Sequence, residues 1–373
     1  MYKVKTLNHV SPVCMKVMTE DRYTISDDMQ DPDAIFVRAT DMHNYEFNPS
    51  LRCIARAGIV VFNTPGGNAN AVKELFLFGL GMASRDLMGG MRWVYNYSDS
   101  EVPVEVAMEK IKKQFAGPEY YKKTIGVIGT GNVGSLVANI ALDMGMKVYG
   151  YDPYLSVNAA WRVSRHVQRV DSLDTLLKNC DYITLHTPLT DETRDMINAD
   201  AIAKMKDGVR IINYARGEVV NEDAIIDGLH SGKVARFVAD FPTARLIKEP
   251  NAVLTPHLGG TTVEAEANCA LMAAEEMDDY LVNGNIRNSV NMPELHLDRS
   301  GRVRICIIHR NLPGMLTALL PIFAKDQVNI ENMTNKSRGE YAYSVFDLNT
   351  DVDDAVVDEL KAVEGVLRVR VLH

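Results

Sequence analysis

Short runs of β-branched and aliphatic residues alternate with amphipathic segments through the central third of the chain. Five of the apolar runs are typical of buried strands: 124–128, 147–151, 182–186, 209–214 and 234–240. Three segments between them have the helical spacing of apolar positions: 131–144, 172–178 and 222–232. This alternation predicts a parallel sheet that is covered by helices on both faces.

The two ends of the chain extend this pattern in different ways. The N-terminal part predicts strands and helices in turn: strands 34–38 and 59–63, helices 49–56 and 70–88. A further helix is expected at 264–283, and a polar linker follows at 293–301. The remaining residues predict a small α+β unit in the order βαββαβ. Its expected strands are 303–308, 328–335, 340–348 and 366–372, and its helices are 315–325 and 353–363.

Composition narrows the class of function. The chain has 373 residues, and its 40 basic and 49 acidic side chains give a net charge of −9. This charge disfavours binding to nucleic acid or to an anionic membrane. The five cysteines are scattered without a CxxC pair, so we expect no metal site and a reducing, cytoplasmic compartment. Neither a secretory leader nor a membrane-spanning stretch is expected.

A glycine-rich turn follows the first central strand. In TIGVIGTGNVG (124–134), Gly129, Gly131 and Gly134 form the pattern GxGxxG between a strand and a helix. Such glycines permit a tight turn, a close approach of the backbone to a pyrophosphate, and close packing of the helix. The next strand ends in Asp152, where an acid binds the adenosine ribose and favours NAD over NADP. The sequence therefore predicts an NAD site.

Two polar side chains after later strands are candidates for hydride chemistry on an alcohol or ketone. Arg216 lies in NYARG after the strand 209–214, and its planar guanidinium suits a carboxylate. His257 lies in TPHLGG, and histidine is the natural proton carrier near neutral pH. His186, at the end of its own strand, is the alternative proton carrier.

The ordered motifs VIGTGNVG, Asp152, LHTPLTDETR, NYARG and TPHLGG resemble those of the D-isomer specific 2-hydroxyacid dehydrogenases. The resemblance implies that Arg216 holds the substrate carboxylate and keto oxygen, and that His257 exchanges the proton. It also implies a set of contacts to NAD: Gly131, Asn132 and Val133 at the pyrophosphate, Asp152 at the ribose, and Thr187, Pro188, Ala215 and Gly259 at the nicotinamide.

Segments such as VRATDMHNYEF and NTPGGNANAVKE are similar to the phosphoglycerate dehydrogenase branch of that family. This similarity implies NAD-dependent oxidation of D-3-phosphoglycerate to 3-phosphohydroxypyruvate, the entry to L-serine synthesis, in a homodimer or homotetramer. Arg38 and Arg56 match positions that bind the substrate phosphate, although Arg56 could equally be a solvated helix end. Two alternatives stay open: a glyoxylate or hydroxypyruvate reductase, and a catalytically weak protein that senses NAD and serine.

We therefore expect an α/β fold with two Rossmann-like, doubly wound parallel-sheet domains and a C-terminal βαββαβ domain. Residues 1–95 and 270–298 would form a discontinuous substrate-binding domain. Residues 96–269 would form the NAD-binding domain, and residues 299–373 a regulatory domain.

The first departure from the family concerns the partner of the catalytic histidine. The family has a glutamate there, whereas this chain has Ala244 in DFPTARL. Glu249 is the nearest carboxylate in sequence to His257. Asp240 is the other candidate, and we expect it to contact the cofactor. Without a carboxylate partner for His257, we expect the activity–pH profile to be shifted to lower pH than in an enzyme whose histidine is paired with a glutamate.

The second departure lies between Gly58 and Ile59. The family usually has a substrate-binding loop and a helix at this point, and parallel strands need a connection of a dozen or more residues. Either a deletion has removed part of the substrate site, or the natural chain carries additional residues here. We expect the second.

The C-terminal unit resembles an ACT domain, a module that binds small amino acids. The motifs HRNLPG (309–314) and QVN (327–329) are similar to those of serine-inhibited phosphoglycerate dehydrogenases. The resemblance implies that His309, Asn311 and Asn329 bind L-serine. A surface used only for dimerisation is the alternative.

Overall fold

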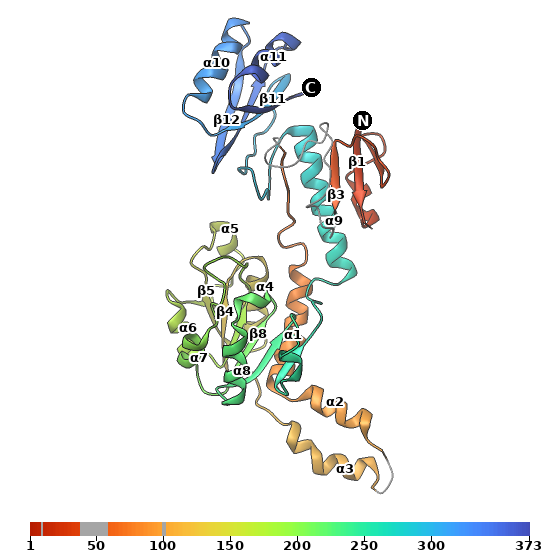
Figure 1. Cartoon of the computed structure of the whole chain (residues 1–373), viewed down its shortest axis with the longest axis vertical. Coiled ribbons are helices and arrows are strands. Elements are labelled where there is room, and N and C mark those ends of the chain that lie inside the picture. Colours follow the sequence, from red (N-terminus) through yellow and green to blue (C-terminus); the bar gives the residue numbers. More distant parts are fainter. Residues whose placement is uncertain (9, 38–58, 99–101) are drawn as a thin grey trace. The chain divides into compact units, whose positions relative to one another are not determined.

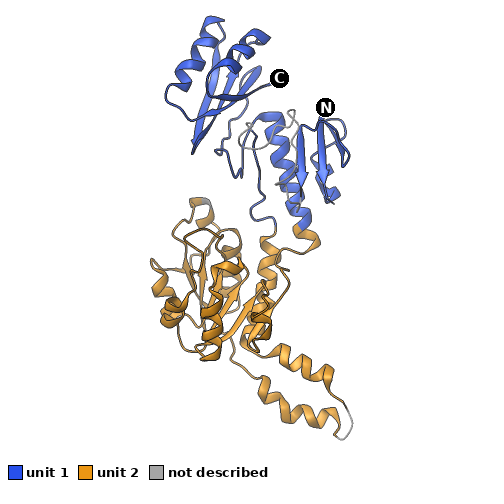
Figure 2. Ribbon diagram, in the orientation of Figure 1, with its two compact units in different colours: residues 1–67, 266–373 blue, residues 68–265 orange. Residues whose placement is uncertain are grey.

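The computed structural model describes residues 1–8, 10–37, 59–98 and 102–373. The chain divides into two compact units (Figure 2). Unit 1 comprises Met1–Gly67 and Glu266–His373, and unit 2 comprises Asn68–Ala265. These units differ from the expected domains, because the helix after Gly67 belongs to unit 2 and the C-terminal residues belong to unit 1. The division into three functional domains stays a prediction.

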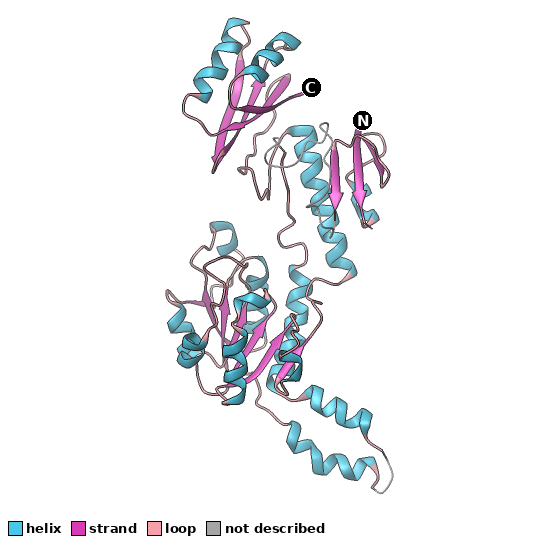
Figure 3. Ribbon diagram, viewed as in Figure 1, coloured by secondary structure: helices cyan, strands magenta, loops and turns pink. Residues whose placement is uncertain are grey.

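Unit 2 contains a parallel sheet with the strand order β10-β9-β8-β7-β4-β5-β6 (Figures 1 and 3). Its strands are β4 Thr124–Ile128, β5 Lys147–Tyr151, β6 Gln168–Arg169, β7 Tyr182–Leu185, β8 Val209–Asn213, β9 Val234–Ala239 and β10 Ala252–Leu254. All five central strands predicted from the sequence are confirmed. The strand β7 is buried along its whole length, as expected for a strand that is covered on both faces.

Helices cover both faces of this sheet. They are α1 Ala69–Ser84, α4 Asn132–Asp143, α6 Leu173–Asn179, α7 Ala199–Lys204 and α8 Glu222–His230. Unit 2 also contains α2 Leu87–Asn96 and α3 Val104–Ile111, which bury no residue, and the short α5 Val157–Ala160. Ile211 packs in the cluster with α6, α7 and α8, whereas Ile212 packs in the cluster with α1 and α4. Because neighbouring residues of a strand point to opposite faces, the sheet is doubly wound.

The single helix expected at 70–88 is wrong. The chain leaves the helical conformation at Arg85, and the carboxylate of Asp86 caps the next helix by accepting a hydrogen bond from the backbone N–H of Gly89. The result is two helices, α1 and α2, in place of one.

Unit 1 begins with a parallel sheet of order β2-β1-β3. Its strands are β1 Tyr2–Leu7, β2 Tyr23–Ser26 and β3 Ala34–Val37. The helix α9 (Val263–Asp278), most of which lies in unit 1, packs its apolar side chains against this sheet and continues into a π-helical turn, Asp279–Asn283.

The strand expected at 59–63 forms only an isolated bridge, between Phe62 and Ser289. Its backbone bonds instead to the segment 288–291, through Asn291 and Val290. The expected helix 49–56 lies outside the described residues, as do Arg38 and Arg56.

The C-terminal part of unit 1 has the predicted βαββαβ order and an antiparallel sheet of order β12-β13-β11-β14. Its elements are β11 Val303–Arg310, α10 Met315–Lys325, β12 Ile330–Arg338, β13 Tyr341–Leu348, α11 Asp354–Ala362 and β14 Val366–Leu372. Ile305 and Ile307 face the two helices, whereas Cys306 and Ile308 pack against the end of α9. One face of this sheet is therefore covered by α10 and α11, and the other by the end of α9.

Candidate cofactor and active site

Each glycine of the GxGxxG turn has a distinct structural role. Gly129 has a φ of +83°, and a Cβ there would lie 2.8 Å from the carbonyl oxygen of His186. A Cβ on Gly134 would lie 1.8 Å from the carbonyl oxygen of Gly129, so the helix and the turn need this glycine to pack closely. A Cβ on Gly131 would meet nothing within 4 Å. The space over Gly131 is therefore open to a ligand.

The N-terminus of α4 provides donors for that ligand. Its N-cap residue is Gly131, and no side chain caps it, whereas Ser172 and Asn221 cap α6 and α8. The first backbone N–H groups of a helix have no partner within the helix and attract anions. Beside the turn, the buried Oγ1 of Thr187 also has no hydrogen-bond partner within the described residues. Open space and unpaired donors at one turn fit a pyrophosphate.

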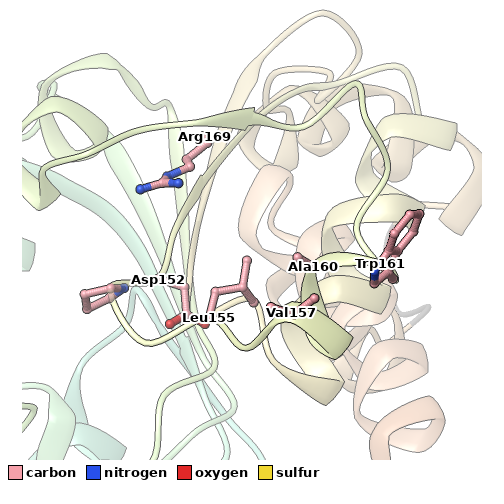
Figure 4. A pocket seen from close by; sticks show the side chains of 7 residues that line it. Asp152, Leu155, Val157, Ala160, Trp161 and Arg169 are labelled. Atoms are coloured by element: carbon pink, nitrogen blue, oxygen red, sulfur yellow. The ribbon is translucent and has the colours of Figure 1, made fainter.

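A cavity of about 390 Å³ lies next to this turn, at the end of β5 (Figure 4). The carboxylate of Asp152 stands at the cavity and accepts hydrogen bonds from the backbone N–H groups of Thr130 (2.8 Å) and Tyr154 (3.0 Å). The other lining residues are largely apolar: Pro153, Leu155, Val157, Ala160, Trp161 and Arg169. An apolar wall with one fixed carboxylate suits an adenosine group.

The glycine-rich turn lies where the order of the sheet reverses, and the cavity lies beside it at β5 and β6. The strands β4 and β7 are neighbours, and the helices that follow them, α4 and α7, pack on opposite faces. Ligands of open α/β sheets bind at such a switch point, outside the carboxyl ends of the strands. The geometry of unit 2 therefore suits a dinucleotide at Gly129–Gly134.

Arg216 stands on a turn that Asn213 holds. Asn213 is buried at the end of β8, and its Nδ2 donates to the carbonyl oxygen of Arg216 (2.8 Å). Its Oδ1 accepts from the backbone N–H of Ala215 (3.1 Å). The Arg216 side chain is exposed, with one guanidinium N–H donating to the carbonyl of Ala215 (2.7 Å). Most of its donors are thus available for an anionic ligand.

His257 stands on a loop that Asp240 holds. The buried carboxylate of Asp240 accepts hydrogen bonds from the backbone N–H groups of Leu258 (2.7 Å) and Gly259 (2.6 Å) and from the hydroxyl of Thr255 (2.5 Å). His257 itself has a φ of +56° and an exposed side chain, and its ring lies 5.0 Å from that of Phe241. The loop therefore presents the imidazole to solvent in a fixed backbone conformation.

Comparison with known proteins agrees with this geometry. Residues 90–259 match the family described as D-isomer specific 2-hydroxyacid dehydrogenase, NAD binding domain. The D-3-phosphoglycerate dehydrogenase of Haemophilus influenzae is 33% identical over 336 residues, which cover 87% of this chain and 78% of the relative. The enzyme of the same name from Escherichia coli K12 is 34% identical over 337 residues, with the same coverage. The chain belongs to the D-isomer specific 2-hydroxyacid dehydrogenase family.

Solved structures show the same fold at lower identity. Rhodotorula graminis D-mandelate dehydrogenase has a TM-score of 0.67 and 20% identity, over 80% of this chain and 99% of that one. A D-lactate dehydrogenase from Treponema pallidum has a TM-score of 0.62 and 22% identity, over 77% and 99%. This protein is therefore an NAD-dependent dehydrogenase of mixed α/β fold, with NAD as its cofactor.

The carboxylate expected beside His257 is not Glu249 in this dehydrogenase. The Oε2 of Glu249 lies 2.8 Å from Nε2 of His230, at the end of α8. Within the described residues, no carboxylate oxygen lies within 4 Å of the His257 ring nitrogens. Proximity in sequence was misleading because the turn Leu246–Lys248 directs Glu249 towards α8.

His186 is poorly suited to carry the proton. Burial lowers the pKa of His186 to about 3, so its imidazole stays neutral at physiological pH. Its Nε2 lies 2.9 Å from the hydroxyl of Thr184, and its ring contacts Phe76 of α1. The exposed His257 is the better candidate.

The expected effector residues are not equivalent. His309 is buried, with Nδ1 2.8 Å from the carbonyl oxygen of Arg310 and Nε2 2.9 Å from the hydroxyl of Ser344. Asn311 and Asn329 are exposed. His309 therefore has no nitrogen left for an effector, which corrects that expectation.

Sequence reasoning missed Asn213, which sets the position of the Arg216 turn, and assigned Asp240 to the cofactor. Asn213 ends β8, and Asp240 directly follows the neighbouring strand β9. Their place at the ends of two buried strands was the available signal. In the parts of the chain that the structure describes, no cluster of three metal-binding side chains occurs, and no helix has the length and apolar character to cross a bilayer.

Proposed function

We propose that this dehydrogenase oxidises D-3-phosphoglycerate to 3-phosphohydroxypyruvate, the first step of L-serine synthesis. The relatives named above support the substrate. The observation that carries the proposal is the arrangement of two exposed groups, Arg216 and His257, on loops held at the ends of the paired strands β8 and β9. The carboxyl ends of these strands lie at the same edge of the sheet as the dinucleotide turn that follows β4.

The two side chains divide the work of the reaction. The guanidinium of Arg216 pairs with the substrate carboxylate and so orients the carbon that carries the hydroxyl. The imidazole of His257 accepts the hydroxyl proton and passes it to solvent, to which it is exposed. NAD, when bound, accepts the hydride. The turn Gly129–Gly134, Asp152, Thr187, Pro188 and Ala215 are the residues that would hold it.

Substitution of the two residues tests this division. His257→Gln should lower kcat by about 10²- to 10⁴-fold with little change in KM, because it removes a proton acceptor. Arg216→Gln should also raise KM for phosphoglycerate, because it removes a ground-state contact. His230→Gln, which removes an exposed imidazole at the end of α8, is the control and should leave both constants unchanged. Full activity in His257→Gln would exclude the assignment.

We also propose that the C-terminal βαββαβ part binds L-serine and lowers activity when it does. Gly314 begins α10 without a side-chain cap, and the exposed Asn311 and Asn329 could bind the amino acid. Calorimetric titration of the full chain should give heat with L-serine. The absence of heat together with unchanged activity would exclude this regulation.

A homo-oligomer is proposed as the functional form. The helices α2 and α3 have no buried residue and expose apolar side chains such as Met91, Val94 and Val106. Exposed apolar faces of this kind are frequent at subunit interfaces. Light scattering should give a mass of at least twice that of the chain.

A further inference from the structure

The N-terminus of α4 lacks a positively charged side chain, although its expected ligand carries two negative charges. The residues over the pyrophosphate, Gly131, Asn132 and Val133, are all neutral. A helix N-terminus supplies only about half an elementary charge. The site therefore leaves most of the ligand charge without a counter-charge from α4 itself.

Arg162 brings a cation to this helix terminus from another segment. It lies in the turn that leaves α5, and its guanidinium donates a hydrogen bond to Oδ1 of Asn132, the first residue of α4. Its side chain is exposed. The guanidinium is thus bonded to the side chain of the residue that begins α4.

The position of Arg162 is fixed by α4. Asn139, two turns further along α4, donates from Nδ2 to the carbonyl oxygen of Arg162 (2.9 Å). Oδ1 of the same residue accepts from the backbone N–H of Ser164 (2.9 Å). One side chain thus holds the backbone on both sides of residue 163 against the helix. The backbone that carries the guanidinium therefore needs little reordering when a ligand binds.

The charge of Arg162 is not neutralised by the protein. Within the described residues, no carboxylate oxygen lies within 4 Å of its guanidinium. Arg169, which lines the adjacent cavity, differs because it pairs with Asp171 at 3.3 Å. A guanidinium has five N–H donors in a planar fork, and one bond to Asn132 leaves the others available to phosphate oxygens.

We propose that Arg162 supplies the cation that binds the pyrophosphate of NAD in this dehydrogenase. The inference rests on the NAD-binding role of unit 2, and it is independent of which hydroxyacid is the substrate. Arg162 follows Trp161, which lines the adenosine cavity, and it bonds to the first residue of α4. It therefore lies between the two parts of the expected cofactor site. It thereby recognises the part of the cofactor that carries charge.

Binding of two cofactor fragments to the full chain tests the proposal. ADP-ribose carries the pyrophosphate, and adenosine lacks it. The variant Arg162→Gln removes the charge and retains an N–H donor for Asn132. Calorimetry should show about a tenfold rise in the Kd of ADP-ribose, with the Kd of adenosine unchanged within twofold. Arg165→Gln, an exposed arginine three residues further along, is the matched control and should change neither Kd.

A rescue variant separates charge recognition from a structural role. In Asn132→Arg/Arg162→Gln, the cation returns on α4 itself, and the affinity for ADP-ribose should recover. Equal losses for ADP-ribose and adenosine in Arg162→Gln would overturn the proposal, because they would indicate damage to the fold. An unchanged Kd for ADP-ribose would overturn it as well. Absence of phosphoglycerate oxidation, by contrast, would count only against the proposed reaction.

Discussion

At the scale of single residues, two buried polar side chains determine where the exposed reactive groups lie. Asn213 satisfies the backbone of the Arg216 turn, and Asp240 satisfies three donors of the loop that carries His257. A buried donor that loses its acceptor costs about 1–3 kcal/mol. The loops should therefore depend on these two anchors more than on their own contacts.

Replacement of Asp240 should show this dependence. In Asp240→Ala, three donors lose their acceptor, and we expect kcat to fall at least about tenfold because the imidazole is no longer positioned. The affinity for NADH, measured by fluorescence, should change much less. A weaker affinity for NADH with unchanged kcat would instead support a direct cofactor contact. Asp207→Ala, at an exposed aspartate paired with Lys233, is the control.

The partly buried His186 predicts a stability that falls in acid. Its folded-state pKa is lowered by burial to about 3, against about 6.5 in the unfolded chain. Only the unfolded state binds the proton between these values, so the free energy of unfolding should fall by about 1.4 kcal/mol per pH unit below pH ~6.

Urea unfolding of the wild type and of His186→Gln at pH 7.5 and pH 5 measures this contribution. The variant should lose less stability between the two pH values than the wild type does. His166→Gln, at an exposed histidine, should behave as the wild type. Equal pH dependence in the wild type and His186→Gln would contradict the account.

Residue roles were predictable from the sequence where the chemistry is local. The roles of Gly129, Gly131 and Gly134 follow from backbone geometry, and the structure gives each the expected environment. The partner of Glu249 could not be predicted, because a carboxylate eight residues from His257 can point to either side of the turn between them. The role of Asn213 could not be predicted either, because its side chain bonds to the backbone of a turn three residues away.

At the scale of elements, the sequence predicted best the strands that are buried on both faces. Thr124–Ile128 has the expected bounds because a continuous apolar run is easy to delimit. Lys147–Tyr151 also has the expected bounds, although only Val148 and Gly150 of this strand are buried. The segment 59–63 has the same composition, but its backbone bonds to residues 288–291. Such long-range pairing leaves no local signal.

The end of α9 depends on an ion pair from the C-terminal sheet. Arg304 and Asp347 are 0% and 1% exposed, and two N–H groups of the guanidinium donate to the carboxylate at 2.6 and 2.8 Å. Arg304 also donates to the carbonyl oxygen of Asn283 at the end of the π-helical turn (2.7 Å). Burial opposes ionisation of Asp347, but the bonds from Arg304 and Ser300 hold its pKa below the usual range.

Asp347→Asn should therefore destabilise this part of unit 1 by about 3–5 kcal/mol, because it leaves Arg304 buried without a counter-charge. Hydrogen exchange of the amides in β11 and β13 would measure the loss. Replacement of both residues, Arg304→Met with Asp347→Leu, should recover most of the stability. Lys361→Ala, which breaks an exposed pair with Asp358, should have almost no effect. A similar small effect in Asp347→Asn would contradict this assignment.

At the scale of the whole molecule, the expected order of domains is only partly reflected in the compact units. The α1 helix packs on the sheet of unit 2, and the C-terminal sheet packs on the end of α9. Neither contact follows from the apolar pattern, because a hydrophobic face indicates burial and does not identify its partner.

The connection at Gly58 and Ile59 gives a prediction about the length of the natural chain. The resemblance to the family carries this expectation, because residues 59–63 form an isolated antiparallel bridge and not a parallel strand. We expect the protein purified from its natural source to contain additional residues. Intact-mass spectrometry should then give more than 41.5 kDa. A mass of 41.5 kDa would exclude additional residues.

The central claim is that this chain is an NAD-dependent dehydrogenase acting on D-3-phosphoglycerate. The most direct test follows the absorbance of NADH while the purified chain is incubated with NAD and D-3-phosphoglycerate, with D-glycerate as the matched substrate that lacks the phosphate. We expect NADH to form with phosphoglycerate, with a kcat/KM at least about a hundredfold above that for glycerate. Equal rates with both substrates, or no NADH with either, would contradict the account.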